Sequence, residues 1–128
     1  MLSSVSIGLS GLEAANLRLD VAANNIANAQ SVGALPGNPG PAPYTPMQVM
    51  QSDSGSGTVA NTVPVDPAYI PTSDPQSPDA NPQGMVAMPN VDLTQQMVEM
   101  AMAQQSYAAN LKTIQMSMST TGRLLGIA

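Results

Sequence analysis

The hydrophobic pattern of this chain is most regular between residues 93 and 125. Positions taken at alternating steps of four and three are apolar in eight of ten cases. A stripe with this period of 3.5 residues is typical of a coiled-coil helix, which packs against another helix along one side. We therefore predict a long C-terminal helix that requires a partner. The stripe consists of Leu93, Met97, Met100, Gln104, Tyr107, Leu111, Ile114, Met118, Thr121 and Leu125.

A second stripe with the same period begins at the N-terminus and predicts a second amphipathic helix. This helix should end near residue 29 or 30, because Gly33 and a run of prolines follow. Gly8 and Gly11 each weaken a helix by about 1 kcal/mol relative to alanine, so we expect firm helical order only from Leu12. The stripe consists of Leu2, Val5, Leu9, Leu12, Asn16, Leu19, Ala23 and Ile26.

The prolines divide the chain into three parts. All twelve lie between positions 36 and 89, where they exclude a helix. We assign residues 1–31 to an N-terminal helix and residues 90–128 to a C-terminal helix, which together form the assembly core. Residues 32–89 are predicted to form an outward-facing, proline-rich insert.

Two short segments of the insert have strand character. Residues 46–51 and 58–65 are predicted to pair as a hairpin, because a polar, glycine-containing connection separates them. Residues 85–88 are predicted to add a third short strand. Between residues 66 and 83 turn-forming residues dominate, and no regular structure is predicted there.

The C-terminal helix has recognisable end signals. Asp92, with Gln95 three residues later, has the form of a capping box and places the start of the helix there. Gly126 is a typical C-terminal stop, and Arg123 in the last turn complements the helix dipole.

The predicted fold is mainly α. Two long terminal helices form an antiparallel coiled-coil-like pair in which the two stripes face each other, and the proline-rich, irregular or β-containing insert returns the chain. Apolar positions beside the stripes would remain exposed in such a pair. Since no further helix is predicted, neighbouring subunits should cover these positions, and head-to-tail contacts would produce an open assembly.

Composition removes several classes of function. The 128 residues include no Cys or His, which excludes a thiol nucleophile and an ordinary zinc or haem site. The net charge is -5, and three cations are too few for nucleic-acid binding. Methionines without Cys or His support, and aspartates separated by prolines, match no metal site. We therefore expect no enzymatic activity, catalytic residue, cofactor, metal, small-molecule substrate or membrane insertion, and no cleavable signal peptide is visible.

The residues with a predicted functional role are those that pack helices within and between subunits. Asn16 lies in the N-terminal stripe, where a polar residue can set the register between helices. We also expect the amides of Asn24 and Asn25 to bond across subunit boundaries, and the hydroxyl of Tyr107 to reach a neighbour. The full set of predicted assembly residues is Leu9, Leu12, Asn16, Leu19, Asn24, Asn25, Ile26, Met97, Met100, Tyr107, Leu111, Ile114, Met118 and Leu125.

Several segments resemble one known family. Residues 10–29, which contain the run Ala-Asn-Asn-Ile-Ala-Asn, resemble the N-terminal signature of bacterial flagellar basal-body rod and hook proteins. Residues 78–92, running into residues 96–100, resemble a second signature found in proximal rod proteins. Residues 107–111, Tyr-Ala-Ala-Asn-Leu, resemble a segment near the C-terminus of these axial proteins.

The resemblance implies a self-associating structural subunit of the proximal rod. Its terminal helices would pack in concentric layers, transmit torque and enclose the export channel. The implied partners are copies of itself, other rod proteins, the motor (MS) ring, the export gate and the distal rod. The implied location is the periplasmic rod of the basal body, reached through the flagellar type III export apparatus without cleavage of a signal.

Two alternatives remain at this stage. The chain could be another axial or rod paralogue of the same family. It could instead be a soluble helical adaptor or export chaperone, which would form a small, defined oligomer rather than a polymer.

Overall fold

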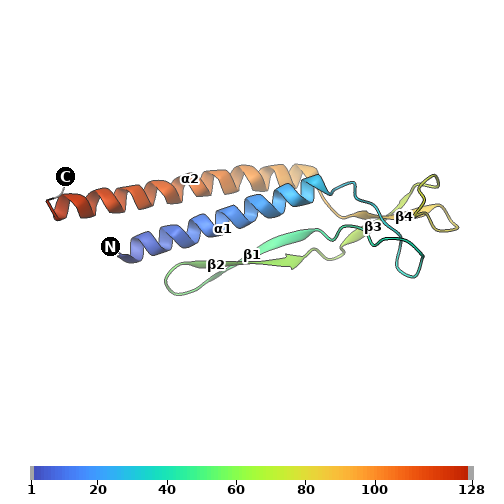
Figure 1. Cartoon of the computed structure of the whole chain (residues 1–128), viewed down its shortest axis with the longest axis horizontal. Coiled ribbons are helices and arrows are strands. Elements are labelled where there is room, and N and C mark those ends of the chain that lie inside the picture. The colour runs from blue at the N-terminus through green and yellow to red at the C-terminus, as the bar shows by residue number, and fades with distance from the viewer. Residues whose placement is uncertain (1, 127–128) are drawn as a thin grey trace.

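A computed structural model describes residues 2–126 of the chain; residues 1, 127 and 128 of the two predicted terminal segments, and the side chain of Leu2 in the predicted stripe, lie outside this description. Two helices run antiparallel beside each other, and two β-hairpins complete the molecule (Figure 1). The elements are α1 (Leu2–Ala27), β1 (Met47–Asp53), β2 (Thr58–Pro64), β3 (Tyr69–Ser73), β4 (Met85–Pro89) and α2 (Leu93–Leu124).

The middle of the chain is more regular than predicted, so the mainly α fold class with a proline-rich irregular insert is wrong. Of residues 2–126, 46% are helical and 20% are in strands, and these strands form two separate antiparallel sheets of two strands each. The predicted hairpin is present as β1 and β2, with Met47 opposite Pro64. Its connection is stabilised by the Asp53 carboxylate, which accepts a hydrogen bond from the Gly55 amide at 2.9 Å.

Strand β3 lies in the segment predicted to be without regular structure. It pairs with β4, and Pro71 lies opposite Ala87. A proline donates no backbone hydrogen bond and is tolerated at a sheet edge. Both strands of a two-stranded sheet are edges, which explains why a proline-containing segment forms a strand here.

The helix ends largely follow their sequence signals. The Asp92 side chain caps α2 by accepting a hydrogen bond from the Gln95 amide at 3.1 Å. Gly126 has a φ of 67°, as expected of a C-terminal stop. Helix α1 ends at Ala27, slightly earlier than predicted. It is helical from Leu2 onward, so the expectation of firm helical order only from residue 12 is wrong.

A small buried core joins the helices to the β3–β4 hairpin. Gly33 and Ala87 exchange two backbone hydrogen bonds of 3.0 and 2.8 Å, which tie the segment after α1 to β4. A Cβ atom on Gly33 would lie 2.4–2.6 Å from backbone atoms of residues 41–43, so only glycine fits there. Val86 and Ala34 are also buried at this junction. The core holds the end of α1 and the start of α2 close together.

The β1–β2 hairpin lies along α1 rather than projecting from the molecule. In Figure 1 α1 lies between α2 and this hairpin, while β3 and β4 extend beyond the junction end of the helices. Contacts of β1 and β2 with helices are made to α1. Helix α1 therefore contacts α2 on one side and the β1–β2 hairpin on another, and the candidate site lies along these contacts.

Candidate functional site

Small residues line the contact between α1 and α2. A Cβ atom on Gly8 would lie 2.7 Å from Cγ1 of Ile114, and one on Gly11 would lie 2.6 Å from the amide of Asn110. Ala22 on α1 is buried against the same helix contact. Glycine and alanine allow two helix backbones to approach closely. The glycines that reduce helix propensity are thus the residues at which α2 packs.

The two predicted hydrophobic stripes do not make up the whole contact between the helices. Several stripe residues lie one position after a contact residue, as Leu9 follows Gly8 and Leu111 follows Asn110, whereas the stripe residue Ile114 itself packs on Gly8. One residue corresponds to a rotation of about 100° around a helix. The stripes therefore do not account for the whole contact, because Gly8 and Gly11 lie outside the α1 stripe and meet Ile114 and Asn110 of α2.

Several residues of both stripes instead lie on one side of the helix pair. In two antiparallel right-handed helices, the same rotation away from the contact line leads to the same side. Leu9, Met97 and Met118 are 52%, 60% and 62% exposed. We call this surface the apolar flank; it contains no charged residue and consists of Leu9, Leu12, Asn16, Leu19, Ala23 and Ile26 on α1 and Leu93, Met97, Gln104, Leu111 and Met118 on α2.

The other predicted assembly residues lie closer to the helix contact or at its end. Met100, Tyr107 and Ile114 are half-buried near α1, as are the flank residues Leu12, Leu19 and Ile26. Leu125 is exposed at the C-cap of α2. Asn16 and Asn24 are exposed, and the Asn24 amide donates to the Asp20 carbonyl one turn earlier in α1.

Asn25 is the exception among the predicted residues because it is 1% exposed and fully hydrogen-bonded within the chain. Its Nδ2 donates to the Met47 carbonyl at 2.7 Å and to Oε1 of Gln96 at 3.0 Å. Its Oδ1 accepts from the Tyr44 hydroxyl at 3.0 Å and from the Met47 amide at 3.1 Å. An asparagine side chain has two donor and two acceptor positions, and all four are used.

Asn25 therefore joins α1, α2 and the start of β1 instead of bonding to another subunit. Burial at this junction raises the pKa of Tyr44 above its ordinary value of 10.0. Sequence reasoning identified Asn25 but missed Tyr44, Met47 and Gln96 as its partners. These partners are far from Asn25 in the sequence, and no local pattern links them.

Arg18 makes a second connection among the same three elements. Its Nε lies 3.3 Å from Oε1 of Glu99 on α2, and its Nη2 donates to Oε1 of Gln51 on β1 at 2.9 Å. Both members of the ion pair are partly exposed, so the pair stabilises the fold modestly and mainly sets alignment.

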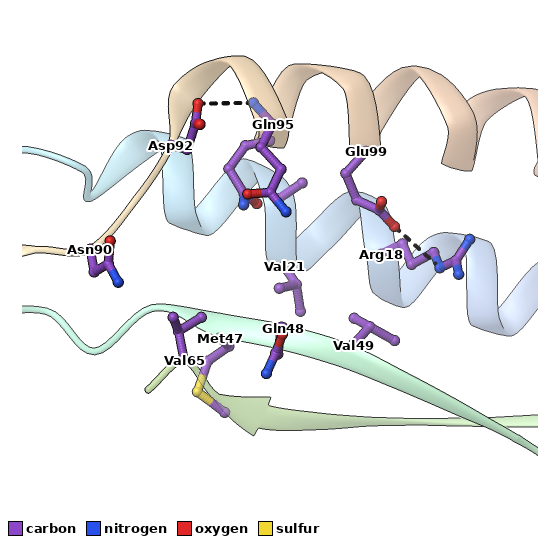
Figure 2. A pocket seen from close by; sticks show the side chains of 12 residues that line it. Arg18, Val21, Met47, Gln48, Val49, Val65, Asn90, Asp92, Gln95 and Glu99 are labelled. Carbon is purple, nitrogen blue, oxygen red and sulfur yellow. Dashed lines mark hydrogen bonds and ion pairs between the residues drawn. The ribbon is translucent and has the colours of Figure 1, made fainter. Parts of the chain in front are cut away.

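A cavity of about 330 Å³ lies between α1, α2 and β1 (Figure 2). Val21 lines it from α1, Val49 lines it from β1, and the Arg18–Glu99 ion pair closes one side. Glu99 is engaged in this ion pair and Asp92 in capping α2, so the lining shows no free pair of carboxylates. Across residues 2–126 there is no group of three or more His, Cys, Asp or Glu residues placed to hold a metal ion. Nor is any helix in this range long and apolar enough to cross a membrane.

Comparison with known proteins identifies the family. The profile described as "Flagella basal body rod protein" matches residues 6–34, and the profile "Flagellar basal body rod FlgEFG protein C-terminal" matches residues 83–127. These ranges contain most of α1 and all of α2, and they confirm the resemblance seen in the sequence signatures.

Full-length relatives agree with these profiles. The flagellar basal-body rod protein FlgC of Bacillus subtilis is 33% identical over 95% of this chain and 92% of its own length. FlgC of Agrobacterium fabrum is 39% identical over 82% of this chain and 78% of its own length. FlgC of Borreliella burgdorferi is 29% identical over 99% of this chain and 97% of its own length. The chain therefore belongs to the family of flagellar basal-body rod proteins and is most similar to its FlgC members.

Proposed function

We propose that this chain, a structural subunit of the flagellar basal-body rod, enters the rod by packing its apolar flank against helices of neighbouring subunits. The exposure of large side chains on the flank carries this proposal, because Leu9, Met97 and Met118 are each more than half exposed. Fully burying one such side chain contributes about 1.5–3 kcal/mol. Several of them buried together would supply the association energy that the chain's own fold does not use.

The chain interacts with other components of the basal-body rod. We infer that these neighbours include copies of itself and other rod proteins, with the MS ring and export gate at one end and the distal rod at the other. In this position the helix pair transmits torque and helps to enclose the export channel. The role is structural and requires no catalytic residue or cofactor.

We further infer that the chain reaches the periplasmic rod through the flagellar type III apparatus without cleavage of a signal. The small size of the buried core supports passage in an unfolded form. Many of the fully buried side chains are alanines, and two glycines line the helix contact. A pair of helices with so little buried apolar area is marginal until neighbours cover it.

Met97→Asp tests the role of the flank, and Met50→Asp is its matched control. Met50 is 58% exposed on β1, away from the flank, whereas Met97 is 60% exposed on it. Both variants would be expressed in cells lacking the native protein, and intact basal bodies would be purified and analysed by mass spectrometry. Since burying a carboxylate in an apolar contact costs several kcal/mol, we expect at least about a tenfold loss of Met97→Asp from basal bodies.

The control variant should be incorporated at the native level. The amount of each variant exported from the cell must also be measured, because a loss of export would lower incorporation without involving the flank. Incorporation of Met97→Asp at the native level would overturn the proposed role of the flank. Recovery of the native chain only as a small cytosolic oligomer would favour an adaptor instead.

A further inference from the structure

Strand β1 has an open edge on the side that faces the helices. In an antiparallel hairpin, the backbone groups of successive residues point alternately toward the partner strand and away from it. Met47 points away from β2, because its amide and its carbonyl both bond to the Asn25 side chain. The register along β1 is continuous, so Val49, Gln51 and Asp53 point away from β2 as well.

The Asn25 side chain occupies the first residue of this edge as a neighbouring strand would. Its Nδ2 donates to the Met47 carbonyl at 2.7 Å, and its Oδ1 accepts from the Met47 amide at 3.1 Å. A residue in a paired antiparallel strand exchanges the same two bonds with its partner. Within residues 2–126, nothing forms such a pair with the backbone of Val49 or Gln51, the next two residues of the edge.

The outer edges of the other strands are interrupted. Pro64 lies opposite Met47, which points away from β2, so this proline lies on the outer edge of β2. Pro71 lies on the outer edge of β3 in the same way, opposite Ala87. On β4, Ala87 already exchanges two backbone bonds with Gly33. Proline lacks the N–H that an added strand requires and protects exposed edges, and β1 contains no proline.

The open edge borders a groove whose other wall is α2. The cavity of about 330 Å³ has Val49 of β1 on one side and Gln95 and Glu99 of α2 on the other (Figure 2). A second cavity of about 540 Å³ lies between the far end of β1 and a later part of α2. Arg18 lines both cavities. The groove therefore follows β1 along most of residues 47–53.

A buried donor in this groove lacks an acceptor. Arg18 Nε is buried and makes no hydrogen bond among the described residues, although Oε1 of Glu99 lies 3.3 Å away. Nη2 of the same guanidinium donates to the Gln51 side chain at 2.9 Å. Strand side chains stand perpendicular to the sheet, so this bond leaves the backbone edge free. The β1 edge and Arg18 Nε both lack partners that a polypeptide can supply.

We propose that β1 accepts an extended segment of a neighbouring rod component as an added strand, in the groove between the hairpin and α2. The bonds of Asn25 to Met47 point to this occupant, because they reproduce the contact of a paired strand at the start of the edge. The proposal rests on the proposed function, since it specifies how one neighbour binds. It concerns the hairpin and is separate from the apolar flank.

The groove also defines the chemistry of the segment. Alternate residues of the segment donate their amides to β1, so these residues are not proline. Three acidic residues border the groove, Asp53, Asp92 and Glu99, and Arg18 is the single cation among the lining residues. The segment is therefore neutral or basic, because an acidic one would be repelled.

Proline substitution tests the edge directly. Val49→Pro removes an amide that points away from β2, so the bonds between β1 and β2 are kept. Thr62→Pro is the matched control, because Thr62 lies opposite Val49 and points to the other outer edge of the hairpin. Urea unfolding of both purified variants checks that the hairpin survives each change. In cells lacking the native protein, we expect about tenfold lower incorporation of Val49→Pro than of Thr62→Pro into basal bodies. Equal incorporation would overturn the proposal.

Photo-cross-linking identifies the occupant without changing the edge. The photoreactive amino acid p-benzoylphenylalanine would be placed at position 95, an exposed residue in the α2 wall of the groove. After irradiation of purified basal bodies, we expect a cross-link to a second polypeptide. Tandem mass spectrometry should locate it in a proline-free, neutral or basic segment. The cross-link should fall about tenfold when Val49→Pro is added to the same chain and should persist with Thr62→Pro.

Other outcomes of the cross-linking contradict the proposal. Cross-links that stay within one chain, or none at all in chains that are present in basal bodies, would mean that the groove holds only water. A cross-link to an acidic or proline-rich segment would also overturn strand addition. Absence of the native chain from basal bodies would instead count against the proposed function, so the two failures are distinguishable.

Discussion

The two sides of α1 are built in different ways. On one side the β1–β2 hairpin is held by polar contacts, which include the Ser10 hydroxyl accepting from the Thr58 amide at 3.2 Å and the Arg18 guanidinium donating to Gln51. Cavities of about 330, 540 and 240 Å³ lie along this boundary. On the other side is the apolar flank, where Leu9 of α1 and Met97 and Met118 of the adjacent α2 are exposed.

This difference separates the side chains that hold the fold together from those that the fold leaves exposed. Contacts within the chain use glycine, alanine and directional hydrogen bonds, which define geometry while burying little apolar area. Several large apolar side chains, such as Leu9, Met97 and Met118, remain exposed on the flank.

Asn25→Leu should cause the largest loss of stability. It removes the hydrogen bonds that hold α1, α2 and β1 together and leaves the apolar flank unchanged. The substitution removes four hydrogen bonds. The Tyr44 hydroxyl, the Met47 amide and carbonyl, and Oε1 of Gln96 each lose their bond to the Asn25 side chain. Leaving buried polar groups unpaired costs about 1–3 kcal/mol each, and partial access of water reduces the sum. We expect a loss of about 3 kcal/mol in the free energy of unfolding, measured by urea denaturation.

The matched control for this variant is Asn24→Leu, at the neighbouring position on α1. Asn24 is exposed and bonds only within its own helix, so the change should stay within about 0.5 kcal/mol. Equal losses at both positions would mean that Asn25 has no special role in joining the hairpin to the helices.

Gly8→Ala should cause the next largest change in stability. Compared with Gly122→Ala, it tests the close contact between α1 and α2. At Gly8 the new methyl group would meet Ile114, and overpacking of this kind costs about 1–3 kcal/mol. At Gly122 nothing lies within 4 Å, so alanine should stabilise α2 by up to about 1 kcal/mol. Thermal unfolding should therefore shift in opposite directions. A stabilising effect at both positions would contradict the need for glycine at the contact.

We expect the smallest effect in a pH titration, which tests the burial of the Tyr44 hydroxyl. Burial raises the pKa of Tyr44 in the folded chain, so the unfolded chain releases this proton first as the pH rises. The associated stability is fully present below pH 10.0 and is lost as the pH rises through the higher pKa of the folded state. The urea midpoint of the native chain should fall more steeply above pH 10 than that of Tyr44→Phe. Parallel curves would show that Tyr44 ionises equally in both states. The other two tyrosines are common to both chains and serve as the internal reference.

Much of the local structure follows from local chemistry. The cap at Asp92, the stop at Gly126 and the β1–β2 hairpin were predictable, because each depends on residues within a few positions of one another. The missed strand β3 depends on β4, more than ten residues further along the chain. Pro71 within it and the prolines on either side indicated a loop, and only the partner strand makes the segment extended and regular.

The candidate site was partly predictable. Both hydrophobic stripes were identified by residue, and most of their members lie on the apolar flank. The residues of α1 that contact α2 were not all predictable. A prediction from hydrophobicity chooses leucine and methionine as contact residues before glycine. At Gly8 and Gly11 the absence of a side chain, rather than its hydrophobicity, determines where α2 packs.

The sequence by itself determined two long helices, their ends, one hairpin and an apolar surface with no charge on it. These features depend on propensity and periodicity, which are properties of neighbouring residues. Only the tertiary structure decided which faces of the helices meet and that Asn25 bonds within the chain. It also left the leucines and methionines of the flank facing outward. The reason is geometric: a rotation of about 100° separates the face of α1 that packs on α2 from the exposed apolar flank, and which face packs depends on how closely two distant helices approach.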